Sequence, residues 1–226
     1  MEKGLSVGEF NRRINESLSG GDYPVDRMID DMTAKIGRER DHVVFDSRLA
    51  WHFVPESFKV FIMTDLDEAA RRVFHDSTRS ESESYESWQE CRKALVNRQK
   101  FETVRYMEIY GIDYYRMGNY NLVLDSTDAS PQEVASEIMD RMEDYQNGEF
   151  HRIVELNPSS IRRSDGNTFS GADIEVVENE GVFTLRAGGS CLDRVVASGR
   201  KFVPVRVTVS GSVGENGFMD FSGMSE

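Results

Sequence analysis

The chain has 226 residues, which is enough to bury a substantial core in one domain or two. Its formal net charge of −13 argues against a protein that binds the phosphate backbone of nucleic acid. The two cysteines lie a hundred residues apart, which excludes a disulfide framework and a zinc-finger spacing. Because no apolar run could span a membrane and the first ten residues carry no hydrophobic signal, we expect a cytoplasmic protein without membrane contact.

Helices and strands alternate along the first two thirds of the chain, which is typical of an α/β fold with a parallel sheet. Capping signals, such as Ser130 followed three positions later by Glu133, mark where helices begin. Short apolar runs mark the strands, and we expect the first two of these to be buried in the interior of the sheet. The expected helices cover residues 6–18, 24–40, 66–74, 85–110 and 131–145, and the expected strands cover residues 43–46, 58–64 and 120–125.

The composition changes near residue 147, where glycine becomes more frequent and the apolar runs become short and β-like. Runs at 153–156, 174–177, 182–186 and 202–209, with one helical stretch at 192–198, predict a small α+β module. A mobile tail is expected after it. The predicted domains are therefore residues 1–147 and 150–209, followed by a flexible tail at 210–226.

Charged residues recur on one face of the helix expected at 85–110. Arg98, Glu102 and Arg105 are four and three positions apart, so they share that face. A solvated face with an ordinary Arg–Glu pair accounts for the spacing. Forked guanidinium groups on one face would also bind phosphate oxygens, two bonds at a time. Arg48 follows the strand expected at 43–46, and the spacing alone leaves both interpretations open.

The order of the motifs resembles the cytidylate kinase family over residues 1–141. The motifs are D-S-R-L-A from Asp46, E-A-A-R-R from Glu68, R-x-x-x-E-x-x-R-Y-x-x-x-Y-G-I-D from Arg98, and N-L-V-L-D-S-T from Asn121. The resemblance implies a P-loop-kinase-like three-layer domain that transfers a phosphoryl group from ATP, with Mg²⁺, to CMP or dCMP. One position departs from the family, since Ser47 stands where a glycine usually precedes the arginine.

The resemblance also implies roles for individual residues. The arginine after the third strand of the family, matching Arg48, holds the monophosphate substrate. The substrate-binding candidates are Arg48, Arg98, Arg105 and Asp113, and the lid candidates around the phosphates are Arg71, Arg72 and Arg98.

The sequence lacks the G-x-x-x-x-G-K-[ST] loop that cradles the phosphates of ATP in P-loop kinases. In the family this loop precedes the position that matches Met1, together with the strand at the centre of the sheet. The given sequence starts downstream of the true start, or the protein is a non-catalytic remnant that senses nucleotides or regulates a partner, or another chain or the C-terminal module fills the gap. In each case we expect the isolated chain to be inactive as a kinase.

The C-terminal module, residues 150–209, resembles ParB-like and sulfiredoxin-like domains. Gly188, Leu192 and Gly199 fall in register with that pattern, while its hallmark arginine is replaced by Cys191. The thiol of Cys191 is either a half-buried structural group or a redox nucleophile. If the chain is the regulatory remnant described above, we expect this module to contact a protein partner.

Overall fold

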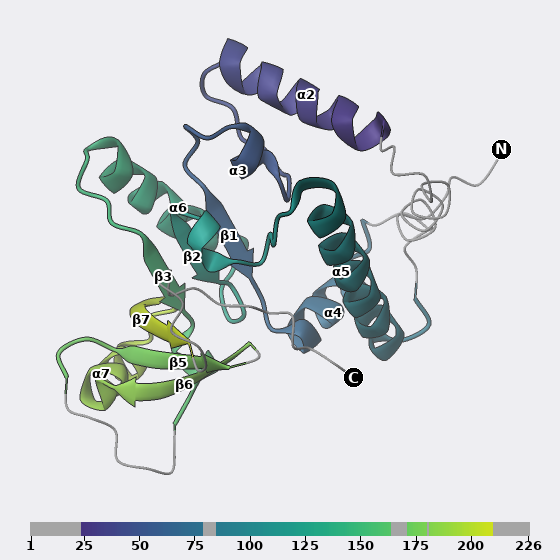
Figure 1. Ribbon diagram of the computed structural model, residues 1–226. Helices are drawn as coiled ribbons and strands as arrows, with labels where there is room; N and C mark the ends of the chain where they lie inside the picture. Colours follow the sequence, from purple (N-terminus) through teal and green to yellow (C-terminus); the bar gives the residue numbers. More distant parts are fainter. Residues whose placement is uncertain (1–23, 79–84, 164–170, 180, 210–226) are drawn as a thin grey trace. The chain divides into compact units, whose positions relative to one another are not determined.

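The computed structural model describes residues 24–78, 85–163, 171–179 and 181–209 (Figure 1). The helix predicted at 6–18 and the tail predicted at 210–226 lie outside these residues. The chain divides into two compact units. We call Met1–Glu56 with Asp65–Tyr114 the helical unit, and Ser57–Thr64 with Tyr115–Glu226 the sheet unit.

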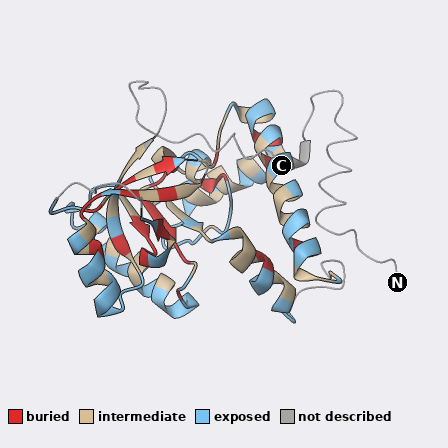
Figure 2. Cartoon of the chain, turned by 90° about the horizontal axis from the view of Figure 1, so that it is seen from below, coloured by how far each residue is buried: buried red, intermediate tan, exposed pale blue. Residues whose placement is uncertain are grey.

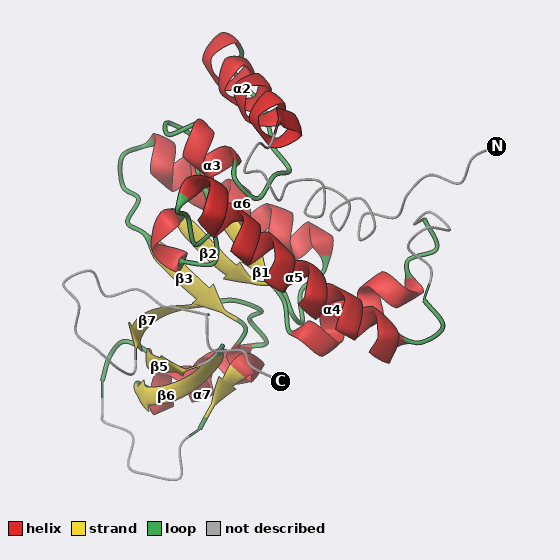
Figure 3. Cartoon of the chain, turned by 45° about the vertical axis from the view of Figure 1, so that its right-hand side comes forward, coloured by secondary structure: helices red, strands yellow, loops and turns green. Residues whose placement is uncertain are grey.

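The helical unit contains four described helices, and local capping explains where two of them begin. The Asp65 carboxylate accepts hydrogen bonds from two backbone amides at the start of α4, and the Ser87 hydroxyl does the same once for α5. Gly111 then ends α5 in a left-handed conformation, with φ 67°, which favours glycine. Helices α4 and α5 pack side by side (Figure 3). The helices are α2 (Pro24–Glu39), α3 (Ala50–Phe53), α4 (Leu66–His75) and α5 (Trp88–Tyr110).

The strand predicted at 43–46 is wrong. These residues have no regular structure, and the side chain of Val44 is 95% exposed. Burial begins only at Leu49 and Ala50, where α3 starts. An apolar, β-branched run forms a strand only when a neighbouring strand pairs with it, and in the described residues none does so here. Arg48 therefore follows a loop without regular structure.

In the part of the chain that the structure describes, the sheet unit contains seven strands in the order β1-β2-β3-β7-β5-β6-β4. Four neighbouring pairs are parallel and two are antiparallel, so the α/β class is confirmed while the expected parallel sheet is a mixed one. Buried residues gather in its strands (Figure 2). The strands are β1 (Val60–Met63), β2 (Leu122–Asp125), β3 (Ile153–Leu156), β4 (Ile161–Arg162), β5 (Glu175–Asn179), β6 (Val182–Ala187) and β7 (Val203–Val209).

Strand β1 lies at the end of this order, and Ile62 on it is about half exposed. The expectation that β1 is an interior strand is therefore wrong for the described residues. Strand β2 is the buried one instead, because all four of its residues are shielded from solvent between β1 and β3. An end strand with apolar side chains keeps unpaired backbone groups along one side.

The sheet continues without a break from the first part of the chain into the last. Strand β2 pairs in parallel with β3, and β3 pairs with β7. Between β2 and β3 the chain forms α6 (Pro131–Gln146), which begins with the predicted capping box of Ser130 and Glu133 and contacts β2. The C-terminal helix α7 (Gly189–Ser198) contacts the short 3-10 helix Pro158–Ser160. The division into domains at 1–147 and 150–209 stays a prediction.

None of the helices in the described ranges is both long enough and apolar enough to cross a membrane.

Candidate functional site

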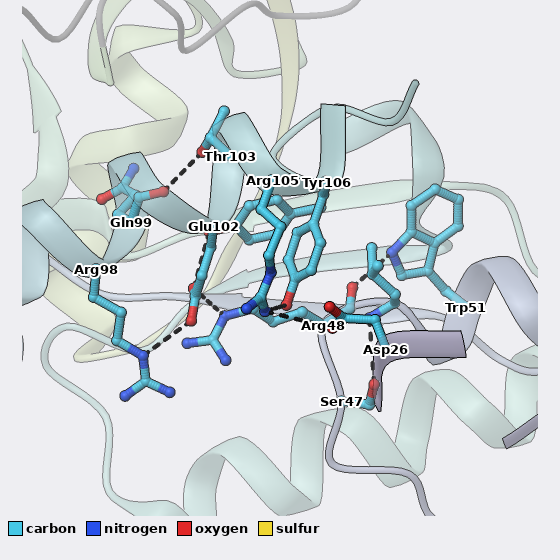
Figure 4. A network of polar contacts seen from close by, with 12 residues as sticks. Asp26, Ser47, Arg48, Trp51, Arg98, Gln99, Glu102, Thr103, Arg105 and Tyr106 are labelled. Atoms are coloured by element: carbon cyan, nitrogen blue, oxygen red, sulfur yellow. Dashed lines mark hydrogen bonds and ion pairs between the residues drawn. The ribbon is translucent and has the colours of Figure 1, made fainter. Parts of the chain in front are cut away.

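One buried carboxylate in the helical unit holds two arginines. The Glu102 carboxylate on α5 forms an ion pair with Nε of Arg48 at 2.7 Å through Oε2, and with Nε of Arg98 at 3.0 Å through Oε1 (Figure 4). The side chain of Glu102 is only 5% exposed, whereas those of Arg48 and Arg98 are 41% and 30% exposed. The carboxylate thus lies behind two guanidinium groups that keep contact with solvent.

The loop that carries Arg48 is fixed on both sides of this residue. The Ser47 hydroxyl accepts a hydrogen bond from the backbone N–H of Leu49 at 3.3 Å, and the indole N–H of Trp51 donates to the carbonyl of Arg48 at 2.9 Å. The burial of Leu49 anchors the same loop. Because the backbone is held in this way, Arg48 needs no strand to position it. Ser47, the position that departs from the pattern discussed above, takes part in this turn through its side chain.

Arg105 extends the cluster by one further turn of α5. Its side chain is 9% exposed, its guanidinium group lies 5.2 Å over the Tyr106 ring, and Nη2 donates to the Tyr106 hydroxyl at 3.4 Å. The same Nη2 lies 3.8 Å from Oδ1 of Asp26 on α2. The hydroxyl of Tyr114 donates to Oε2 of Glu102 at 3.4 Å. Two aromatic side chains therefore wall the cluster on the inner side.

A cation pair of this kind suits an oxyanion. The Nε atoms of Arg48 and Arg98 already bind Glu102, and each guanidinium group carries further N–H donors in a planar fork. Holding the two groups against one carboxylate removes much of their rotamer freedom before any ligand arrives. The arrangement can neutralise and orient a phosphate or carboxylate at its surface.

The sequence-predicted residues divide into two sets. The structure brings Arg48, Arg98 and Arg105 together around Glu102 and Asp26. The two lid candidates on α4 make other contacts: Arg71 lies 4.7 Å over the Trp88 ring, and Arg72 pairs with Glu68 at 2.8 Å. Asp113 follows the end of α5 and is half-buried.

Sequence reasoning missed the acidic and aromatic partners of the cluster. Glu102 was visible by its spacing from Arg98 and Arg105, but its role as the shared partner of Arg48 depends on the tertiary fold. Asp26 gave no signal, because it lies 79 positions before Arg105 in the sequence. One of its carboxylate oxygens, Oδ2, is buried and accepts no hydrogen bond within the described residues.

A shorter carboxylate at position 102 tests whether Glu102 positions the arginines. Glu102→Asp keeps the charge but removes one methylene, so the carboxylate can no longer reach both Nε atoms. We expect the affinity for phosphate-bearing ligands to fall by about three- to tenfold, since each released side chain costs about 0.5–1.5 kcal/mol to order again. Isothermal titration of inorganic phosphate measures this. Glu108→Asp, an exposed position on the same helix, is the control. Unchanged affinity in Glu102→Asp would contradict the positioning role.

A second cluster of charges lies in the sheet unit. Glu155 on β3 is buried, and its carboxylate pairs with Nη2 of Arg141 on α6 at 2.6 Å. The same Nη2 lies 2.9 Å from Glu137. Burial, with the neighbouring Glu137 carboxylate, raises the pKa of Glu155 to about 7 even though Arg141 acts in the opposite direction. This cluster joins α6 to the sheet.

Comparisons with known proteins agree with the motifs of the first part of the chain. Residues 2–128 match the model of a cytidylate kinase-like family. A cytidylate kinase of Methanobrevibacter smithii is 28% identical over 138 residues, which is 61% of this chain and 73% of that protein. A cytidylate kinase of Methanosarcina acetivorans is 31% identical over 128 residues, which is 55% of this chain and 65% of that protein.

A third relative is a longer protein. The S-adenosylmethionine-dependent nucleotide dehydratase of Lacinutrix mariniflava is 28% identical over 141 residues, which is 62% of this chain but 27% of that protein. No solved structure matches the chain. The family match ends at residue 128, so the strands β3 to β7 lie outside it. The ParB-like resemblance of the C-terminal module remains a prediction.

Proposed function

Because the chain belongs to the cytidylate kinase-like family, we propose that its helical unit binds the phosphate of a pyrimidine nucleoside monophosphate, CMP or dCMP, between Arg48 and Arg98. The observation that supports this proposal is the shared carboxylate of Glu102. It pairs with Nε of both arginines and leaves both guanidinium groups partly exposed to solvent. A monophosphate carries up to two negative charges and three acceptor oxygens, which two forked cations satisfy better than a single lysine does.

In the proposed complex the arginines neutralise and orient the phosphate, which is most of what phosphoryl transfer requires of the substrate side of a site. Glu102 keeps the two guanidinium groups from separating. Arg105 lies one turn further along α5 and faces the nucleoside part of the ligand. Asp113 belongs to the same substrate side by resemblance alone.

The described part of the chain does not contain a set of residues that fits ATP and Mg²⁺. No group of three or more His, Cys, Asp or Glu side chains there could hold a metal ion. The sequence has no G-x-x-x-x-G-K-[ST] loop either. The proposal is therefore limited to binding of the monophosphate, and it assigns no residue of this chain to ATP.

The proposal is tested by titrating the 226-residue chain with CMP, dCMP and cytidine in a calorimeter. We expect CMP or dCMP to bind at least about tenfold more tightly than cytidine, because the nucleoside lacks the phosphate that Arg48 and Arg98 would hold. Raising the salt concentration should narrow this difference, since the guanidinium groups are partly exposed. Equal affinity for CMP and cytidine would exclude the proposed phosphate site.

The same chain is expected to show no turnover of CMP with ATP in a coupled assay that detects ADP. Family kinases work at about 1–100 per second, a rate that depends on groups holding the β- and γ-phosphates. Those groups are absent from this sequence in the form of the usual glycine-rich loop. Turnover within that range by the pure chain would show that another part of it performs that task.

A further inference from the structure

Helix α2 packs through its polar side. The Asp30 carboxylate accepts a hydrogen bond from the Tyr110 hydroxyl on α5. At Gly37, an added Cβ atom would lie 2.7 Å from a methyl carbon of Val54, at the end of α3, so the two segments are in close contact there. Because positions 30 and 37 are about two helical turns apart, they mark the inner face of α2.

The apolar side of α2 points away from this inner face. Met28, Ile29 and Met32 are 61%, 54% and 58% exposed, and Ile36 is half-buried. These four residues follow the helical period, so they form one continuous stripe, which we call the α2 stripe. Single exposed apolar side chains are common, but the apolar stripe of a surface helix ordinarily faces a packing partner. The described residues leave the α2 stripe largely exposed.

The segment that directly precedes α2 has apolar residues at a matching spacing. It lies outside the described part of the chain, and its sequence predicts a helix over residues 6–18. Val7, Phe10, Ile14 and Leu18 recur every three or four positions, so a helix of this sequence has one apolar side. Residues 19–23, with the sequence S-G-G-D-Y, separate it from α2. A connection of this length joins helices that run antiparallel beside each other.

An antiparallel arrangement brings the two apolar sides into register. Counting back from the connection along the segment and forward along α2, every apolar residue between positions 7 and 14 reaches the level of a member of the α2 stripe. The levels are Ile14 with Met28 and Ile29, Phe10 with Met32, and Val7 with Ile36.

Charges agree with this register. The basic pair Arg12 and Arg13 comes level with the acidic pair Asp31 and Asp30 of α2. Opposite charges at the same level favour one register over others, because a shift along the helix separates them.

We propose that residues 6–18 form a helix that folds back along α2 and covers the α2 stripe. The contact removes Met28, Ile29 and Met32 from water, and the burial of their apolar surface stabilises it. An isolated helix of this length is marginal in water, so its formation depends on the stripe. The α2 stripe is thus a docking surface for a segment of the same chain, which closes a helical hairpin at the edge of the helical unit.

Engineered cysteine pairs in the full chain test the register. Phe10→Cys with Met32→Cys places two thiols at one level of the contact, whereas Arg12→Cys with Met32→Cys places the first thiol on the opposite side of the segment. A disulfide needs Cα atoms within about 7 Å of each other. We expect the first pair to form an intramolecular disulfide about tenfold or more faster than the second. Peptide mapping identifies the joined thiols, since the chain also contains Cys91 and Cys191. Equal rates for the two pairs would overturn the inference.

The single variant Met32→Cys tests a second copy of the chain as the occupant of the stripe. If two α2 stripes cover each other, this variant forms a disulfide-linked dimer on oxidation, which a non-reducing gel detects. We expect no such dimer, and its formation would overturn the inference.

Hydrogen exchange supplies a measurement that needs no cysteine. In the unaltered chain we expect the backbone amides of residues 10–18 to exchange about tenfold or more slowly than in an unfolded chain. Met32→Asp should remove this protection, because it places a charge in the apolar contact. Arg27→Asp changes an exposed residue on another side of α2 and should keep it. Exchange of residues 10–18 at the unfolded rate in the unaltered chain would overturn the inference, as would protection that survives Met32→Asp.

Discussion

Replacing Arg48 with alanine is expected to weaken the binding of CMP by about thirtyfold or more. Removing a hydrogen-bonded cation from a buried carboxylate such as that of Glu102 costs about 2 kcal/mol or more, and about 1.4 kcal/mol corresponds to tenfold in affinity. Two losses combine in this variant. The phosphate loses a forked donor, and Oε2 of Glu102 loses its cationic partner at 2.7 Å and keeps only the long hydrogen bond from the Tyr114 hydroxyl, so a less compensated carboxylate oxygen faces the ligand.

Arg92→Ala is the matched control for this variant. Arg92 lies on α5 and its side chain is 44% exposed, close to the 41% of Arg48, but its partner is Asp67 on α4. The two variants therefore remove the same charge from similarly exposed positions of the helical unit. Calorimetry should show near-normal CMP affinity for Arg92→Ala. If the two variants lose affinity to the same extent, the effect reflects overall charge, and Arg48 does not hold the phosphate.

The largest expected effect on stability concerns Glu155. Its pKa in the folded protein, about 7, lies above the ordinary value of 4.5 that it takes when the chain unfolds. The folded protein therefore holds this proton more tightly, and its stability decreases as the pH rises from about 4.5 to 7. The free energy of unfolding decreases by about 1.4 kcal/mol for each pH unit in this window, so the total loss of stability approaches about 3 kcal/mol above pH 7.

Urea unfolding of the wild-type chain and of Glu155→Gln at pH 5 and pH 8 measures this effect. Glutamine imitates the protonated acid, so we expect the variant to gain about 3 kcal/mol relative to the wild type between pH 5 and pH 8. Other titrating groups are shared by both proteins and cancel in the comparison. Glu149→Gln changes an exposed carboxylate of the same unit and should leave the pH dependence as it is. If the free energy of unfolding changes equally with pH in the wild type and in Glu155→Gln, the raised pKa of Glu155 is contradicted.

Short sequence patterns were sufficient to predict the helix ends that are determined by hydrogen bonds between neighbouring residues. The Asp65 and Ser130 caps and the left-handed Gly111 determine where helices begin or end through bonds to nearby backbone groups, and these are visible as short sequence patterns. The run at 43–46 has the composition of a strand but lacks a partner, and no local pattern reports a missing partner. The position of β1 at the end of the sheet was unpredictable for the same reason.

The candidate site likewise combines contacts that follow from local spacing with contacts that depend on the tertiary fold. The spacing of Arg98, Glu102 and Arg105 on one helix face follows from the helical period of α5, on which Arg98 pairs with Glu102. The addition of Arg48 came from a family resemblance. The contribution of Asp26 depends on how α2 approaches α5, which is set by packing between helices that are far apart in the sequence.

The position of β7 has a consequence for how the protein is made. It is the last strand of the described chain, but it lies between β3 and β5 in the middle of the sheet order. During synthesis, β3 and β5 can have their shared neighbour only after residue 209 has left the ribosome. Until then the backbone donors and acceptors that pair with β7 in the folded chain have no such partner. Pairings between such distant segments form slowly. The nascent sheet unit therefore stays prone to aggregation until β7 has paired with β3 and β5.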